Sequence, residues 1–194
     1  MGLAVLVLGL AVFIANHIFV TFRGARAAAI ARLGKPVYFS VFGLVSLIGL
    51  ALIVWGYVTY RATGWVQIWY PPVWMRHVTV GLMLFSVVLA TAYIMPSHIK
   101  ARAKHPLLAA VKIWAFAHLL VNGDLGSMIM FGSFLAWAVY ARISAKRRTD
   151  QALPVAPKGW TNDIVVVVLG IVVYLLLGFY FHPYVIGVPV FAAG

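Results

Sequence analysis

The chain has 194 residues, of which 64% are hydrophobic and only 9% are charged. A soluble domain carries about 25% charged residues, so this composition argues against a soluble enzyme and indicates a protein embedded in lipid. The chain has no cysteine, which excludes disulfides, iron–sulfur clusters and thiolate metal sites. Any cofactor ligand is therefore a histidine, a methionine or an oxygen donor.

Six apolar segments of membrane-crossing length follow one another, and they predict an all-α, polytopic transmembrane helical bundle in a single domain, residues 1–194. We expect the spans at residues 2–22, 37–60, 77–95, 106–121, 125–141 and 164–181. The first is read as a membrane helix and not as a signal peptide, because its positive charges follow the apolar run. A basic inner linker, residues 142–163, contains Pro154 and Pro157 and precedes the last helix.

The positive charge is distributed unevenly between the connections. The net charge of +12 would suggest nucleic acid in a soluble chain. Twelve of the 15 basic residues, however, lie in the first, third and fifth connections: Arg23, Arg26, Arg32, Lys35, Lys100, Arg102, Lys104, Arg142, Lys146, Arg147, Arg148 and Lys158. Because basic residues near span ends stay in the cytoplasm, this alternation predicts that both termini lie outside. The partner is therefore the lipid bilayer, not nucleic acid.

Two histidines lie inside predicted spans, where an ionisable group costs roughly 2.5 to 3.5 kcal/mol at the centre of the bilayer. His17 lies six residues before Arg23 and His118 lies six residues after Lys112, so at about 1.5 Å per residue each ring lies roughly 9 Å from a cation. If both cations mark the inner boundary, the rings lie at equal depth, as the axial ligands of a haem iron do. If the fourth span begins at Pro106, His118 lies nearer the outer side and the depths differ. A histidine in a span can also hydrogen-bond to a neighbouring helix without binding a metal.

Each of the other polar residues near His118 has two possible interpretations. Trp114, His118 and Asn122 recur every four residues and share a helix face, which suits either bundle packing or the wall of a haem site. Lys112 either extends to lipid headgroups or pairs with a cofactor propionate. Asp124 is either the N-cap of the fifth span or a carboxylate near a buried site.

Four further histidines lie at the ends of spans or among the inner basic residues. His77 opens the third span and His182 closes the sixth, and we expect both to lie at the outer interface. His98 and His105 lie with the inner basic residues. The dipeptide His105-Pro106 marks the start of the fourth span, because proline is well tolerated at the first helical position.

A long pattern runs through the fourth and fifth spans. Residues 105–108 read His-Pro-Leu-Leu, residues 111–124 read Val-Lys-Ile-Trp-Ala-Phe-Ala-His-Leu-Leu-Val-Asn-Gly-Asp, and residues 131–137 read Phe-Gly-Ser-Phe-Leu-Ala-Trp. This pattern closely resembles the signature of the NnrU family. Asn16-His17, residues 53–57 and the aromatic residues 69–74 extend the resemblance over nearly the whole chain.

The resemblance implies a multi-pass protein of the bacterial inner membrane that is associated with nitrite and nitric oxide reduction in denitrification. The NnrU family is also similar to zeta-carotene isomerase, a membrane enzyme that uses haem b in a cis-to-trans isomerisation. That relation implies a haem b cofactor, with His17 and His118 as axial metal ligands and His105 as a further histidine of the site.

Three functions therefore stay open. The first is a haem-dependent accessory or sensor protein that works with denitrification redox proteins and takes nitric oxide as a small gaseous ligand. The second is a haem-dependent isomerase of a polyene or another lipid-soluble substrate. The third is a membrane protein of assembly or transport that binds no haem.

Overall fold

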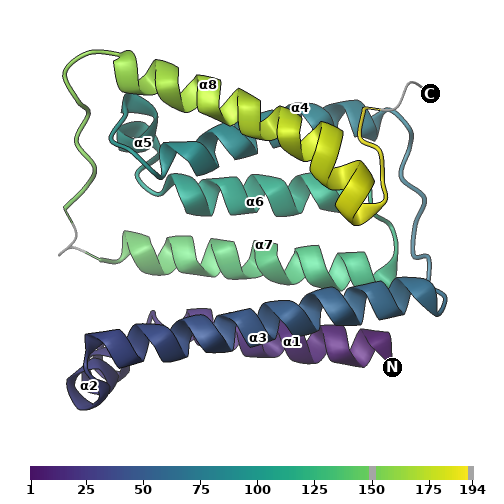
Figure 1. The fold of residues 1–194 in the computed structure, drawn as a ribbon, viewed down its shortest axis with the longest axis horizontal. Coiled ribbons are helices and arrows are strands. Elements are labelled where there is room, and N and C mark those ends of the chain that lie inside the picture. The colour runs from purple at the N-terminus through teal and green to yellow at the C-terminus, as the bar shows by residue number, and fades with distance from the viewer. Residues whose placement is uncertain (149–151, 192–194) are drawn as a thin grey trace. The chain divides into compact units, whose positions relative to one another are not determined.

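The chain is helical over most of its length in a computed structural model that describes residues 1–148 and 152–191 (Figure 1). The described residues contain no named strand, and their helices are α1 (Gly2–Phe19), α2 (Arg23–Leu33), α3 (Lys35–Ala62), α4 (Met75–Ala92), α5 (His98–Ala103), α6 (Pro106–Leu119), α7 (Leu125–Lys146), α8 (Thr161–Leu176) and the π-helical segment η1 (Leu177–Ile186). The all-α class predicted from the sequence is confirmed.

Five of these helical segments are long and apolar enough to cross a membrane: α1, α3, α4, α7 and the continuous segment Thr161–Ile186. The fourth predicted span corresponds to α6, which is apolar but has only 14 residues. At 1.5 Å per residue α6 is about 21 Å long, which is shorter than a hydrocarbon core of about 30 Å. Large apolar side chains are exposed on the long helices, and Trp55 on α3 is 63% exposed. Such surfaces suit lipid, as expected of a multi-pass membrane protein.

Two helices occupy segments that the sequence analysis treated as connections. α2 lies in the first basic connection and has no buried residue. α5 lies in the third, where the side chain of Ser97 caps its first turn by accepting the Lys100 N–H. Alanine and arginine favour helix, but neither segment has an apolar stretch of spanning length, so hydropathy alone does not reveal them. In addition, α7 continues to Lys146, five residues beyond the predicted end of the fifth span and into the predicted linker.

The chain divides into two compact units. The first comprises residues 1–71 and 122–145, with α1, α2, α3 and most of α7. The second comprises the described residues of 72–121 and 146–191, with α4, α5, α6, α8 and η1.

In the first unit α1 packs closely along α3 (Figure 1). Glycines make the close approach possible. A Cβ atom at Gly56 would overlap the backbone of Leu6, and one at Gly9 would lie 2.6 Å from the backbone nitrogen of Ile53. Small residues at a helix interface allow two backbones to approach, which is the usual way in which helices associate in lipid. Residues of α7 pack against the resulting core of Leu6, Leu10 and Ile53.

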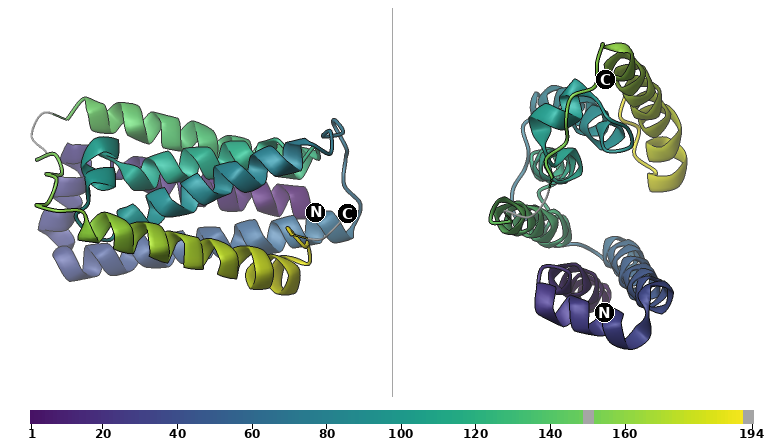
Figure 2. Two further views of the ribbon diagram at one scale, coloured as in Figure 1. Left: turned by 90° about the horizontal axis from the view of Figure 1, so that it is seen from above. Right: turned by 90° about the vertical axis from the view of Figure 1, so that its left-hand side faces the viewer.

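In the second unit α4 contacts both α6 and α8. Hydroxyl groups of α4 donate to backbone carbonyls of the two neighbours: Ser86 to Ala110 at 2.8 Å, and Thr91 to Val166 at 3.1 Å. Such bonds satisfy polar groups that would otherwise face hydrocarbon. Figure 2 shows α8 continuing without a break into η1.

Candidate functional site

His17 lies near the end of α1, in the first unit. Its Nδ1 atom lies 2.8 Å from the carbonyl oxygen of Phe13, and because a carbonyl oxygen only accepts, Nδ1 carries the proton. The lone pair of the neutral ring is then on Nε2. The ring stacks on Phe13 with centroids 4.1 Å apart and meets Phe42 and Trp137 edge-on at 5.2 and 5.4 Å. His17 is thus a half-buried histidine of known tautomer among aromatic rings.

His118 lies one residue before the end of α6, in the second unit. Its Nδ1 atom donates to the carbonyl oxygen of Trp114 at 2.8 Å, and the centroids of the two rings lie 5.4 Å apart. The predicted proximity of these side chains on one helix face is therefore present. His17 and His118 have the same local arrangement, a bond from Nδ1 to the carbonyl four residues earlier. Histidines that bind metals usually donate their other ring N–H in this way.

His182 is a histidine that the sequence analysis placed at the outer interface and did not include in the site. In the second unit its ring centroid lies 6.3 Å from that of His118, with the ring planes at 26°. Its Nδ1 atom donates to the carbonyl oxygen of Leu177 at 2.9 Å. One sequence signal could have found this pair. If the fourth span begins at Pro106, the predicted topology brings His118 and His182 to the same outer side of the membrane.

The π-helical winding around His182 has a local cause. Pro183 lies inside η1, and in an α-helix its ring would collide with the carbonyl four residues earlier. A wider π turn relieves that collision, and such turns are frequent at functional sites. His182 therefore lies on a turn whose geometry its own neighbour imposes.

The bounds of α6 decide where Lys112 and His118 lie along this helix. This helix begins at Pro106, so Lys112 lies at its middle and His118 at its far end. Lys112 does not mark the inner end of the helix, and the reason for expecting His17 and His118 at equal depth no longer applies. The two histidines belong to different units, and their ligation of one iron stays a prediction.

Asp124 caps the start of α7 in the first unit. Its Oδ1 accepts the Ser127 N–H at 3.0 Å, and its Oδ2 accepts the Ser127 hydroxyl at 2.6 Å and lies 3.3 Å from a guanidinium nitrogen of Arg61. Because the Ser127 hydroxyl donates to the carboxylate, it accepts from the Tyr57 hydroxyl, 2.7 Å away. Asp124 is only 2% exposed. These bonds are those of an N-cap, the first of the two interpretations of Asp124. They also join α3 to the start of α7.

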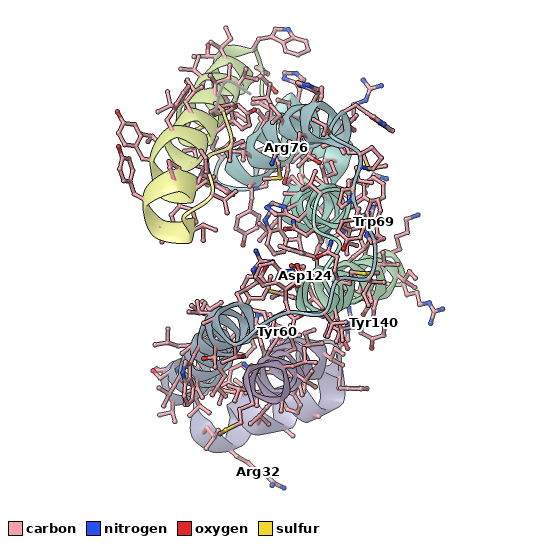
Figure 3. The ribbon with its side chains drawn as sticks, turned by 90° about the vertical axis from the view of Figure 1, so that its right-hand side faces the viewer. Arg32, Tyr60, Trp69, Arg76, Asp124 and Tyr140 are labelled. Atoms are coloured by element: carbon pink, nitrogen blue, oxygen red, sulfur yellow. The ribbon has the colours of Figure 1, made fainter. Side chains whose placement is uncertain are left out.

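The turn before Asp124 fits against the segment that follows α3. The carbonyl of Gly123 accepts the backbone N–H groups of Ile68 and Trp69 at 2.8 and 3.2 Å. A Cβ atom at Gly123 would overlap the carbonyl of Trp69, so only glycine fits this position. Figure 3 labels Trp69 together with Asp124 and Tyr60 in this part of the first unit. The Asn-Gly-Asp motif therefore has a structural role in closing this turn.

The remaining predicted residues are dispersed along the chain. His105 is the N-cap residue of α6, at the opposite end from His118, and their separation of 13 positions along the chain corresponds to roughly 20 Å of helix rise. Lys112 lies half-buried between these ends. Asn122 lies beyond the last residue of α6, Leu119, in the turn before α7 and in the first unit. The prediction that it shares a helix face with Trp114 and His118 is therefore wrong. Within the second unit, α6 therefore does not bring His105 beside His118.

The ligand set bears on which group the protein could bind. Among the described residues no group of three His, Cys, Asp or Glu side chains is arranged to hold a metal ion. Both described carboxylates have partners: Asp124 as above, and Asp163 through the His98 Nδ1–H at 2.8 Å and the Ile99 N–H at 3.0 Å. A bare zinc ion needs three or four protein ligands. A haem iron has four porphyrin nitrogens already and needs only one or two imidazoles, which fits the residues present.

Comparison with known proteins identifies a family. The family model described as "NnrU protein" matches residues 5–190. The matched range includes every candidate residue named above, from His17 to His182. No curated protein and no solved structure matches the chain.

Proposed function

We propose that this chain, which belongs to the NnrU family, is a membrane protein of the bacterial inner membrane that binds haem b. In this proposal His17 and His118 are iron ligands, and the protein supports nitrite and nitric oxide reduction together with denitrification redox proteins. The observation that carries the proposal is the shared arrangement of the two histidines. Each donates its Nδ1–H to a carbonyl of its own helix at 2.8 Å, so its basic nitrogen is Nε2.

The residues around His17 are suited to holding a ligand imidazole. The bond to the Phe13 carbonyl fixes the ring about its χ angles, and the stacked Phe13 ring supports one face. The edges of Phe42 and Trp137 surround the ring with apolar atoms, which limits the access of water. A preorganised and partly dry ligand loses little freedom when it binds.

When bound, haem supplies an iron that transfers an electron or takes a small ligand such as nitric oxide. The protein's own contribution is to hold imidazole rings in one tautomer and orientation. His105 and Lys112 lie away from His118 on α6. In this proposal they do not ligate the iron but support the site, for example by contact with a propionate.

The test is an optical spectrum of the full chain, purified in detergent from haem-replete cells, with a pyridine haemochrome assay for the haem type. We expect a Soret band and haem b. His17→Ala and His118→Ala should each change the Soret band, whereas His77→Ala, at an exposed position on α4, should leave it unchanged.

Two outcomes would contradict the proposal. A colourless protein would favour the assembly or transport function, which requires no haem. A coloured, reduced protein that converts a cis-polyene but does not bind nitric oxide would favour the isomerase.

A further inference from the structure

We propose that the hairpin of α2 and α3 binds the phosphate of an anionic phospholipid, with the guanidinium of Arg26 and the hydroxyl of Tyr38 as hydrogen-bond donors. The site lies wholly in the first unit and does not depend on whether the protein binds haem.

The position of α2 places it at the membrane surface. Figure 2 shows that α2 lies across the ends of α1 and α3, two neighbouring helices that are long and apolar enough to span a bilayer. The end of a spanning helix lies at the level of the lipid headgroups, so α2 lies along that level. Phe22, just before α2, and Leu33, its last residue, are both exposed. Such apolar side chains insert at the boundary between headgroups and acyl chains.

Two buried donors at this end of the unit have no hydrogen-bond partner among the residues that the structure describes. They are the Nε–H of Arg26 and the hydroxyl of Tyr38. Tyr38 as a whole is only 6% exposed, and a buried polar group without a partner is costly. A guanidinium has only donors, and a tyrosine hydroxyl is able to donate. Both groups therefore suit a single acceptor with several oxygen atoms.

The two donors belong to facing sides of the hairpin. The half-buried residues of α2 are Arg26, Ala29 and Ile30, which share one helix face. That face is turned toward α3, on which α2 packs. Gly34 alone joins the two helices, and Tyr38 is the buried residue in the first part of α3. Arg26 and Tyr38 therefore lie at the same interface of α2 and α3.

Charge indicates an acceptor that is anionic and comes from outside the first unit. Of the three acidic residues of the chain, only Asp124 belongs to this unit, and it pairs with Arg61 at the far end of α3. Anionic lipids give the membrane surface a negative potential at the level of α2. The cations near the hairpin are Arg23, Arg26, Arg32 and Lys35.

The local structure favours a phosphate in particular. A guanidinium matches the oxygens of a phosphate with its planar fork of donors. α3 begins at Lys35 without a side-chain cap, so the positive end of its dipole adds to the attraction. Because α2 has no buried residue, a small displacement of this helix disturbs little packing and admits the phosphate to the two donors.

The test measures lipid binding to the full chain in detergent by native mass spectrometry. Phosphatidylglycerol should bind more tightly than phosphatidylcholine, which has the same phosphate but no net charge. Arg26→Lys keeps the charge but loses the Nε–H, and Tyr38→Phe removes only the hydroxyl. Each should weaken phosphatidylglycerol binding about tenfold, as expected for a lost hydrogen bond to a charged group.

The matched control is Arg32→Lys. Arg32 lies on the same helix but is exposed, and Figure 3 shows its side chain extending away from the helices. The affinity for phosphatidylglycerol should be unchanged in this variant. Equal losses in Arg26→Lys and Arg32→Lys would indicate a diffuse basic surface and overturn the site.

The remaining outcomes also decide the proposal. Equal binding of the two lipids would contradict the preference for an anionic phospholipid. Inorganic phosphate is the competitor, and displacement of phosphatidylglycerol at equal concentration would assign the site to free phosphate instead. If Arg26→Lys does not fold, Tyr38→Phe decides alone, because it removes a single oxygen atom; unchanged affinity in that variant would refute the role of the hydroxyl and with it the proposed site.

Discussion

Replacing Asp124 with alanine should destabilise the first unit at the start of α7. The substitution removes an N-cap, which contributes about 1 kcal/mol. It also leaves the buried hydroxyl of Ser127 without its acceptor at 2.6 Å, and an unsatisfied buried group costs roughly 1 to 3 kcal/mol. The ion pair with Arg61 adds little, because the Arg61 side chain is 40% exposed and the distance is 3.3 Å. The expected loss is therefore about 2 to 4 kcal/mol.

The matched variant is Asp124→Asn. Asparagine caps helices about as well as aspartate and keeps an acceptor oxygen for Ser127, so the loss should be only about 1 kcal/mol. Reversible unfolding in mixed detergent micelles, followed by circular dichroism, measures both variants. Equal losses for the two variants, or a loss below about 0.5 kcal/mol for alanine, would refute the reasoning.

Two further predictions concern packing and topology. Gly56→Ala should destabilise the packing of α1 against α3 by about 1 to 3 kcal/mol through overpacking. The control is Gly43→Ala, also on α3, where a Cβ atom meets nothing within 4 Å; it should be neutral or slightly stabilising. Unfolding in micelles compares the two variants, and equal losses of stability would contradict the close approach of the helices. Because the chain has no cysteine, single cysteines test the orientation. A membrane-impermeant thiol reagent should label Tyr70→Cys in intact spheroplasts, and Val155→Cys only after permeabilisation. Both positions are well exposed, at 83% and 82%, so burial does not prevent labelling. Labelling of Val155→Cys but not of Tyr70→Cys in intact spheroplasts would disprove the predicted topology.

Several local features of the site could be read from the sequence. The four-residue spacing of Trp114 and His118 predicted a shared helix face, and their ring centroids lie 5.4 Å apart. The Asp124 position before an apolar run predicted an N-cap, and the Ser127 N–H donates to its carboxylate. Both features depend on residues within one helical turn, where backbone geometry alone decides which groups meet. The basic helix α2 was not predicted, because its helical character has no hydropathy signal.

By itself the sequence determined that the protein belongs in a membrane and where its long helices lie, because the transfer of a segment into lipid depends on the summed hydropathy of its residues. It did not determine that His182 lies 6.3 Å from His118. That proximity depends on how α6 and α8 are rotated against α4, through bonds such as those of Thr79 and Tyr174. Helix rotation in lipid is set by close packing and by individual hydrogen bonds, which composition does not encode. Only the tertiary structure could therefore bring these two histidines together.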